Sequence, residues 1–133
     1  MNPALGAPTS RMRVLVAFED VRSAYADAIA RALRDLRSGL SVRSAVLEEL
    51  ERELYGFDPH VVVCSQPSGT RPTGNGAWVH IPTGDAKEGD ERLAGICLDG
   101  EHWRTDGPAL SELLAVIDET HKRLREGDLS EAC

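Results

Sequence analysis

The sequence predicts an α/β domain in which helices cover both faces of a largely parallel sheet. Two short runs, VLVAF at 14–18 and VVVC at 61–64, are continuously apolar and rich in β-branched residues. Such runs are typical of strands that are buried on both faces. The intervening segments alternate between helical and strand patterns, which favours right-handed crossovers between parallel strands. With 133 residues, the chain has a size common for one domain.

The first apolar run predicts a central strand, and an amphipathic helix is expected after it, over 23–37. Apolar side chains recur at helical spacing along this segment, at Tyr25, Ile29, Ala32, Leu33 and Leu36. Ser38-Gly39 supplies a stop signal. The helix should therefore pack one face against the sheet.

A half-covered edge strand and a second helix are expected next. Leu40 and Val42 alternate with polar residues, as in a strand with one exposed face. Apolar residues at helical spacing then mark the helix, at Leu47, Leu50 and Leu54. Ser44 is the expected N-cap of this helix.

The pattern changes after Cys64. Residues 65–76 contain three glycines and two prolines without an apolar period, which indicates a long loop. A short strand at 78–81 and a polar acidic loop at 83–92 follow. The segments 95–98 and 101–103 flank Asp99-Gly100, a dipeptide typical of hairpin turns. The late part of the sheet is therefore not expected to be purely parallel.

The last helix is expected to open at Asp106-Gly107-Pro108, with proline near its first position. Its predicted buried stripe consists of Leu110, Leu113, Leu114, Ile117, His121 and Leu124. We expect one domain at 12–127, between flexible tails at 1–11 and 128–133.

Charge and cysteine content narrow the possible functions. The chain has 22 acidic and 15 basic side chains, and its net charge of −7 disfavours nucleic acid and anionic membranes as partners. No apolar run approaches the roughly 20 residues that span a bilayer, and the start lacks a signal-peptide pattern. The three cysteines are widely spaced without a CxxC, which suggests neither a disulfide framework nor a zinc site. We expect a cytoplasmic protein without metal or other cofactor.

Glu19-Asp20 follow the first strand directly, Thr83 follows the predicted strand at 78–81, and the chain ends in the amphipathic segment PALSELLAVIDETHKRL. With these features, residues 11–126 resemble the receiver domain of bacterial response regulators. Receivers carry an acidic pair for Mg²⁺ after the first strand and Ser or Thr after the fourth, and their last helix is similar to this ending. The resemblance implies a three-layer flavodoxin-like sheet of order 2-1-3-4-5, here with a β-hairpin replacing part of the late α/β units.

Two functional groups of receivers are missing. Their phosphate-accepting Asp lies six residues after a proline, and counting from Pro59 reaches Ser65. Leu98-Asp99-Gly100 stands where receivers place a lysine after the fifth strand. Phosphoryl transfer needs the acceptor carboxylate and a cation on the phosphoryl oxygens. The resemblance therefore implies a non-enzymatic, phosphorylation-independent signalling module whose partner is an unidentified protein or a second copy of the chain.

An alternative function is small-anion binding, or an enzyme site, at the carboxyl ends of the first and third strands. Ligands of open parallel sheets bind where the strand order reverses. The candidate ligand-binding residues are Glu19, Asp20, Cys64, Ser65, Arg71 and Thr83. Simpler interpretations stay open: Glu19-Asp20 as helix-start residues, residues 65–76 as a connecting loop, and Cys64 as a buried thiol instead of a nucleophile with His60 or His80 as base.

A candidate docking face lies on the first helix. Arg31, Arg34 and Arg37 recur every three residues, which would suit an acidic partner. The alternative is a solvated face balanced by Asp27 and Asp35. In the late strands, Trp78 and Trp103 each predict either an interface or a core position.

Overall fold

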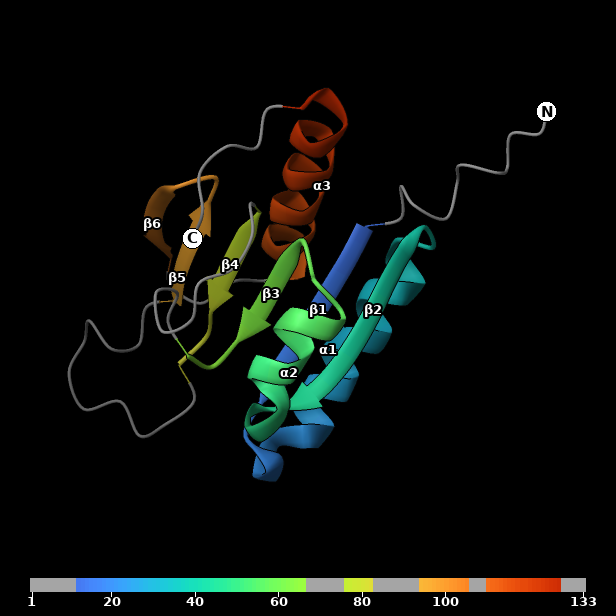
Figure 1. Ribbon diagram of the computed structural model, residues 1–133, viewed down its shortest axis with the longest axis vertical. Coiled ribbons are helices and arrows are strands. Elements are labelled where there is room, and N and C mark those ends of the chain that lie inside the picture. The colour runs from blue at the N-terminus through green and yellow to red at the C-terminus, as the bar shows by residue number, and fades with distance from the viewer. Residues whose placement is uncertain (1–11, 67–75, 83–93, 106–109, 128–133) are drawn as a thin grey trace.

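The computed structural model describes residues 12–66, 76–82, 94–105 and 110–127 (Figure 1). The predicted tails at 1–11 and 128–133 lie outside the described residues, as do 67–75 and 83–93, which make up most of the two predicted long loops. The elements are β1 (Met12–Phe18), the 3₁₀ turn η2 (Asp20–Arg22), α1 (Ser23–Leu36), β2 (Leu40–Val46), the 3₁₀ turn η3 (Leu47–Glu49), α2 (Leu50–Gly56), β3 (Val61–Cys64), β4 (Ala77–His80), β5 (Ala94–Leu98), β6 (Glu101–Thr105) and α3 (Leu110–Glu126).

The described strands form one sheet in the order β2-β1-β3-β4-β5-β6. β1 runs parallel to β2 and β3, and β3 runs parallel to β4. β5 is antiparallel to both β4 and β6. The predicted order 2-1-3-4-5 and the late antiparallel hairpin are therefore confirmed, and the hairpin's second arm adds β6 at the edge.

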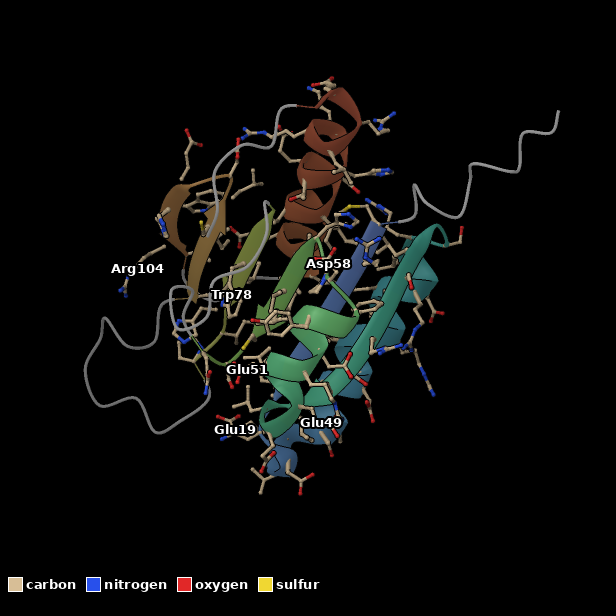
Figure 2. All side chains as sticks on the ribbon, in the orientation of Figure 1. Glu19, Glu49, Glu51, Asp58, Trp78 and Arg104 are labelled. Atoms are coloured by element: carbon tan, nitrogen blue, oxygen red, sulfur yellow. The ribbon has the colours of Figure 1, made fainter. Side chains whose placement is uncertain are left out.

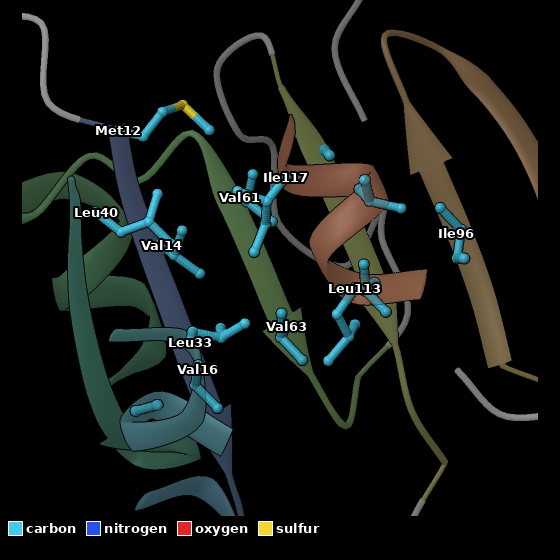
Figure 3. Packing of buried hydrophobic residues seen from close by; sticks show 14 of the residues in the cluster. Met12, Val14, Val16, Leu33, Leu40, Val61, Val63, Ile96, Leu113 and Ile117 are labelled. Atoms are coloured by element: carbon cyan, nitrogen blue, oxygen red, sulfur yellow. The ribbon is translucent and has the colours of Figure 1, made fainter. Parts of the chain in front are cut away.

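Helices cover both faces of the sheet, as predicted. Side chains of β1 alternate between the faces: Val14 and Val16 pack in the cluster that contains residues of α1 and α3, whereas Leu15 and Ala17 pack with α2. Figure 3 shows the first cluster, in which Leu33 of α1 and side chains of α3 meet the strands. The parallel core is thus an apolar layer between helices.

The predicted hairpin turn has the geometry that its sequence favours. Asp99 has φ 53° and Gly100 has φ 88°, so both central residues are left-handed, as in a type I′ turn. The Asp99 N–H donates to the Gly76 carbonyl at 3.0 Å, and its carboxylate lies 3.5 Å from Arg123 of α3. The turn is therefore tied to both the sheet and the last helix.

Gly76 immediately precedes β4 and lies against the backbone of His60, the residue before β3. The Ala77 N–H donates to the His60 carbonyl at 2.9 Å, and a Cβ on Gly76 would overlap that carbonyl. A residue without a side chain is therefore required for β4 to approach β3 here.

The prediction that Ser44 caps the second helix is wrong. Strand β2 continues through Ser44 to Val46, and the Ser44 hydroxyl donates to the Asp27 carboxylate of α1 at 2.7 Å. The helical segment begins with η3 at Leu47, and no side chain caps η3 or α2. The serine joins β2 to α1 instead.

The last helix is confirmed, but its buried face differs from the predicted stripe. The buried residues are Leu113, Val116, Ile117 and Thr120, whereas Leu110 is 37% exposed. The Thr120 hydroxyl donates to the Val116 carbonyl at 2.7 Å, which allows a polar residue at a core position. The predicted opening at 106–108 lies outside the described residues.

One cysteine differs from expectation. Cys97 of β5 is disulfide-bonded, although the spacing of the cysteines suggested no disulfide, while Cys64 is free and buried. Along the described residues, no helix combines the length and apolar character that crossing a membrane requires.

Candidate functional site

The structure brings several predicted ligand-binding residues to one edge of the sheet. Ala17 of β1 and Cys64 of β3 are register partners, and the Ser65 N–H donates to the Ala17 carbonyl at 3.3 Å. Glu19 follows β1 directly, and Asp20 opens η2. Arg71 and Thr83 lie outside the described residues. The ends of β1 and β3 are therefore neighbours, as the topology predicted.

Cys64 is poorly suited to nucleophilic chemistry. Its side chain is fully buried, and its sulfur accepts a hydrogen bond from the Gln66 N–H at 3.3 Å. Burial raises the pKa of the Cys64 thiol to about 11, and the nearby Glu19 charge acts in the same direction. Because the thiolate is the reactive form, the geometry favours a buried strand thiol.

Among the described residues, Ser65, Glu19 and Asp20 are not grouped as ligands of a metal ion. The Ser65 hydroxyl is buried without a hydrogen-bond partner among the described residues. Glu19 lies 3.9 Å from Arg22, an i,i+3 pair on the surface. Within the described ranges, no group of three or more His, Cys, Asp or Glu side chains is arranged to hold a metal ion.

Two of the three candidate docking arginines, Arg34 on α1 and Arg37 directly after it, bond within the chain. Arg37 makes a bidentate contact with the Asp118 carboxylate of α3, at 2.7 and 3.0 Å, which raises the pKa of Arg37 and lowers that of Asp118. Arg34 donates to the Val42 carbonyl of β2 at 2.8 Å. Arg31 lies beside Asp27 and borders a shallow surface hollow. These bonds help to hold α1 against its neighbours.

A cleft that the sequence interpretation missed lies on the late strands. In the register of β4, β5 and β6, one row joins His80, Gly95 and Arg104, and the next joins Trp78, Cys97 and His102. Both rows lie on the face that carries α2, and Figure 2 shows Trp78 and Arg104 to the left of that helix. The cleft has a volume of about 490 Å³.

One sequence signal could have identified half of this cleft. A two-residue hairpin at Asp99-Gly100 places Gly95 opposite Arg104. The pairing of β4 with β5 has no comparable local signal, because residues 81–93 separate the two strands.

A second hollow, of about 370 Å³, lies on the other face between β6 and α3. It is lined by Leu98, Glu101, Trp103, Glu112, Ala115, Val116, Glu119 and Arg123. Trp103 is 41% exposed at this hollow, which places the aromatic side chain at the surface instead of in the core. We refer to this site as the β6–α3 hollow.

In comparisons with protein-family models, curated proteins and solved structures, nothing matched the chain. The structure shows an α/β domain, and the likeness to receivers stays a prediction.

Proposed function

We propose that this chain is a receiver-like, non-enzymatic protein-interaction module, independent of phosphorylation, that binds a basic segment of a partner protein in the β6–α3 hollow. The observation that carries the proposal is the half-exposed Trp103 beside an apolar floor of Leu98, Ala115 and Val116. Exposed aromatic residues next to apolar hollows are common anchors of protein interfaces.

The charged side chains around the β6–α3 hollow indicate which kind of partner it fits. Among the described residues, its rim carries three glutamates and one arginine, and Arg123 already lies 2.9 Å from Glu119 and 3.5 Å from Asp99. The rim is therefore acidic, in a chain whose net charge is −7. A basic segment with an apolar anchor complements it, whereas a second copy would bring like charges together.

Two observations support a receiver-like scaffold without a phosphorylation switch. The order β2-β1-β3-β4-β5 is the one expected of flavodoxin-like domains, although β5 is antiparallel here. Ser65, a residue without a carboxylate, stands at the position of the receiver's phosphate acceptor. Such a domain would act through its surface and not through acyl-phosphate chemistry.

The interaction can be tested with a labelled synthetic amphipathic peptide that carries leucine on one face and lysine on the other. Fluorescence anisotropy should show saturable binding to the full chain, and a peptide with glutamate in place of lysine should not bind. Trp103→Ala should weaken binding by about tenfold or more, and Glu101→Lys should also weaken it. Tyr55→Ala is the control, because Tyr55 is 84% exposed on α2.

Equal binding of both peptides, or unchanged affinity of Trp103→Ala, would contradict the proposed site. Sedimentation at several concentrations tests the second copy as occupant. A concentration-dependent dimer that Trp103→Ala abolishes would replace the basic partner by self-association.

Independence from phosphorylation needs its own test. Amide NMR spectra with Mg²⁺, then with Mg²⁺ and beryllofluoride, should show no saturable shifts at Glu19, Asp20 or Ser65. Saturable shifts clustered at these residues would mean that the acidic pair still holds a metal and an anion.

A further inference from the structure

A stripe of apolar side chains runs along the outer side of α1 and the η2 turn before it. Its members recur every three or four residues, as in the seam of a coiled coil: Val21, Tyr25, Ala28, Ala32 and Leu36. Val21 is 88% exposed, and Tyr25 and Leu36 are each 48% exposed. The buried residues of α1 lie on its opposite side, at Ala26, Ala30 and Leu33. These five residues, which we call the α1 stripe, therefore form an apolar surface that the fold leaves open.

The α1 stripe is bulky at its ends and small in the middle. The Tyr25 ring meets Phe18 edge-on, with 5.2 Å between the ring centroids, so the half-exposed side chain is held in position. A shallow hollow of about 490 Å³ lies over the alanines that follow, Ala24, Ala28 and Ala32. Because the interaxial distance of packed helices depends on the side chains at the contact, alanines allow a second helix to approach closely.

The charged residues beside the α1 stripe alternate in sign. Asp27, Arg31 and Asp35 border the hollow. The Asp27 carboxylate accepts the Ser44 hydroxyl at 2.7 Å, which orients it. In the part of the chain that the structure describes, Arg31 makes no hydrogen bond or ion pair. This surface therefore carries both signs of charge, unlike the acidic rim of the β6–α3 hollow.

We propose that a second copy of the chain binds to the α1 stripe, with the two α1 helices antiparallel about a two-fold axis beside Ala28. Val21 then faces Leu36 of the second copy, and Tyr25 lies over its small Ala32. The axis makes each contact twice, so one face serves both copies. Among the described residues, this interface shares none with the β6–α3 hollow, so it goes beyond the interaction proposed above.

The same arrangement opposes unlike charges. Asp27 faces Arg31 of the second copy, and Asp35 faces its Arg22, which also lies 3.9 Å from Glu19 of its own chain. Antiparallel helices also bring opposite ends of their dipoles together. In a chain of net charge −7, self-association is favoured on a surface where both signs are present, as they are on α1.

The test measures self-association of the full chain by sedimentation equilibrium. The 14 residues of α1 span about 21 Å, so the contact is small and the dissociation constant should be on the order of 100 µM. A reversible dimer should therefore appear between about 10 µM and 1 mM protein. A monomer throughout this range would overturn the proposal.

Matched variants locate the interface. Ala28→Glu places two carboxylates beside the axis and should weaken the dimer by about tenfold or more. Ala115→Glu makes the same change at an exposed position of α3, in the β6–α3 hollow, and should leave the dimer unchanged, as should Trp103→Ala. An unchanged dimer in Ala28→Glu, or a dimer that Trp103→Ala abolishes, would overturn the proposal.

A charge exchange tests the antiparallel register. Asp27→Arg and Arg31→Asp each place like charges opposite one another, and each should weaken the dimer by about tenfold. An equimolar mixture of the two variants should recover the wild-type affinity, because every pair is again of unlike charge. Circular dichroism checks that both variants are folded. Failure of the mixture of folded variants to associate would overturn the proposed arrangement.

Discussion

The two halves of the sheet differ in how they are covered. The β1–β3 half is parallel, and β1 and β3 are buried between α1 on one face and α2 on the other, while β2 is partly exposed at the edge. The β4–β6 half ends in an antiparallel hairpin, and β6 is largely exposed. The β6–α3 hollow and the cleft on β4, β5 and β6 both lie in this second half. The difference teaches that the half enclosed by helices leaves few strand side chains at the surface, whereas the hairpin half exposes them.

The cause of this difference is the way the strands are connected. A parallel neighbour requires a crossover of about a dozen residues or more, usually with a helix that covers the sheet. β5 and β6 are joined by Asp99 and Gly100 alone, so β6 is added without its own covering helix. The hairpin therefore produces exposed strand faces with few residues.

The largest expected effect is a loss of stability when a core side chain is shortened. Leu33→Ala on α1 removes a fully buried side chain packed against the sheet, and should lower the free energy of unfolding by about 3 kcal/mol. Leu110→Ala on α3, at a residue 37% exposed, should cost less than about 1 kcal/mol. Denaturant unfolding followed by circular dichroism measures both. Equal losses would mean that burial does not distinguish these elements.

A smaller effect is expected at the junction of the two halves. Gly76→Ala would place a Cβ against the His60 carbonyl, so β4 must shift, and the free energy of unfolding should fall by about 2 kcal/mol. Gly56→Ala is the control, because nothing lies within 4 Å of a Cβ at that helical position. The same measurement applies. A loss no larger than that of Gly56→Ala would show that the junction is loosely packed.

Acid should weaken the fold through histidines in both halves. Burial lowers the pKa of His60 and of His80, and the His60 Nδ1 accepts the Arg13 N–H at 3.0 Å, which requires a neutral ring. The unfolded chain then binds protons more tightly. The free energy of unfolding should therefore be fully present above about pH 6.5 and fall as the pH drops below it.

Single histidine variants show how much of this pH dependence comes from each half of the sheet. His60→Asn and His80→Asn should each flatten the slope of the unfolding free energy against pH below about pH 6.5. A wild-type slope in both variants would show that carboxylates alone account for the acid sensitivity.

The last prediction concerns the reactivity of the Cys64 thiol, where almost no native reaction is expected. Because Cys64 is fully buried and the pKa of its thiol is raised to about 11, iodoacetamide should modify it at least about 100-fold more slowly in the native protein than in denaturant. Mass spectrometry of the Cys64 peptide measures both rates. Fast native modification would show that the β3 end opens readily and would return this cysteine to consideration as a nucleophile.

The periodicity of the sequence was sufficient to predict the strands and helices of the β1–β3 half of the sheet, and the turn signal was sufficient to predict the hairpin. The runs at 14–18 and 61–64 are apolar enough to identify buried strands, and Asp99-Gly100 favours one turn type. Ser44 misled the interpretation because a capping residue and an edge-strand serine look alike locally. Thr120 was not predicted to be buried, because a hydrophobic pattern does not reveal that its hydroxyl bonds to a carbonyl of its own helix.

The candidate sites were harder to predict, because they depend on pairing between distant segments. Glu19 and Ser65 could be placed at neighbouring strand ends from topology alone. His80 and Arg104 belong to one cleft only through the β4–β5 and β5–β6 registers. The hollow at Trp103 lies between β6 and α3. The apolar stripe of α3 predicts which face of the helix is buried, but not which strand it lies beside.

The absence of a side chain at position 95 also bears on how such a protein can change during evolution. An added methyl group there would meet His80 only at ordinary contact distance, so the backbone has room for alanine at this position. A small change at position 95 can therefore alter the wall of the cleft while the scaffold persists. Descendants of one ancestral chain can differ in the shape of this cleft and still share the β6–α3 hollow.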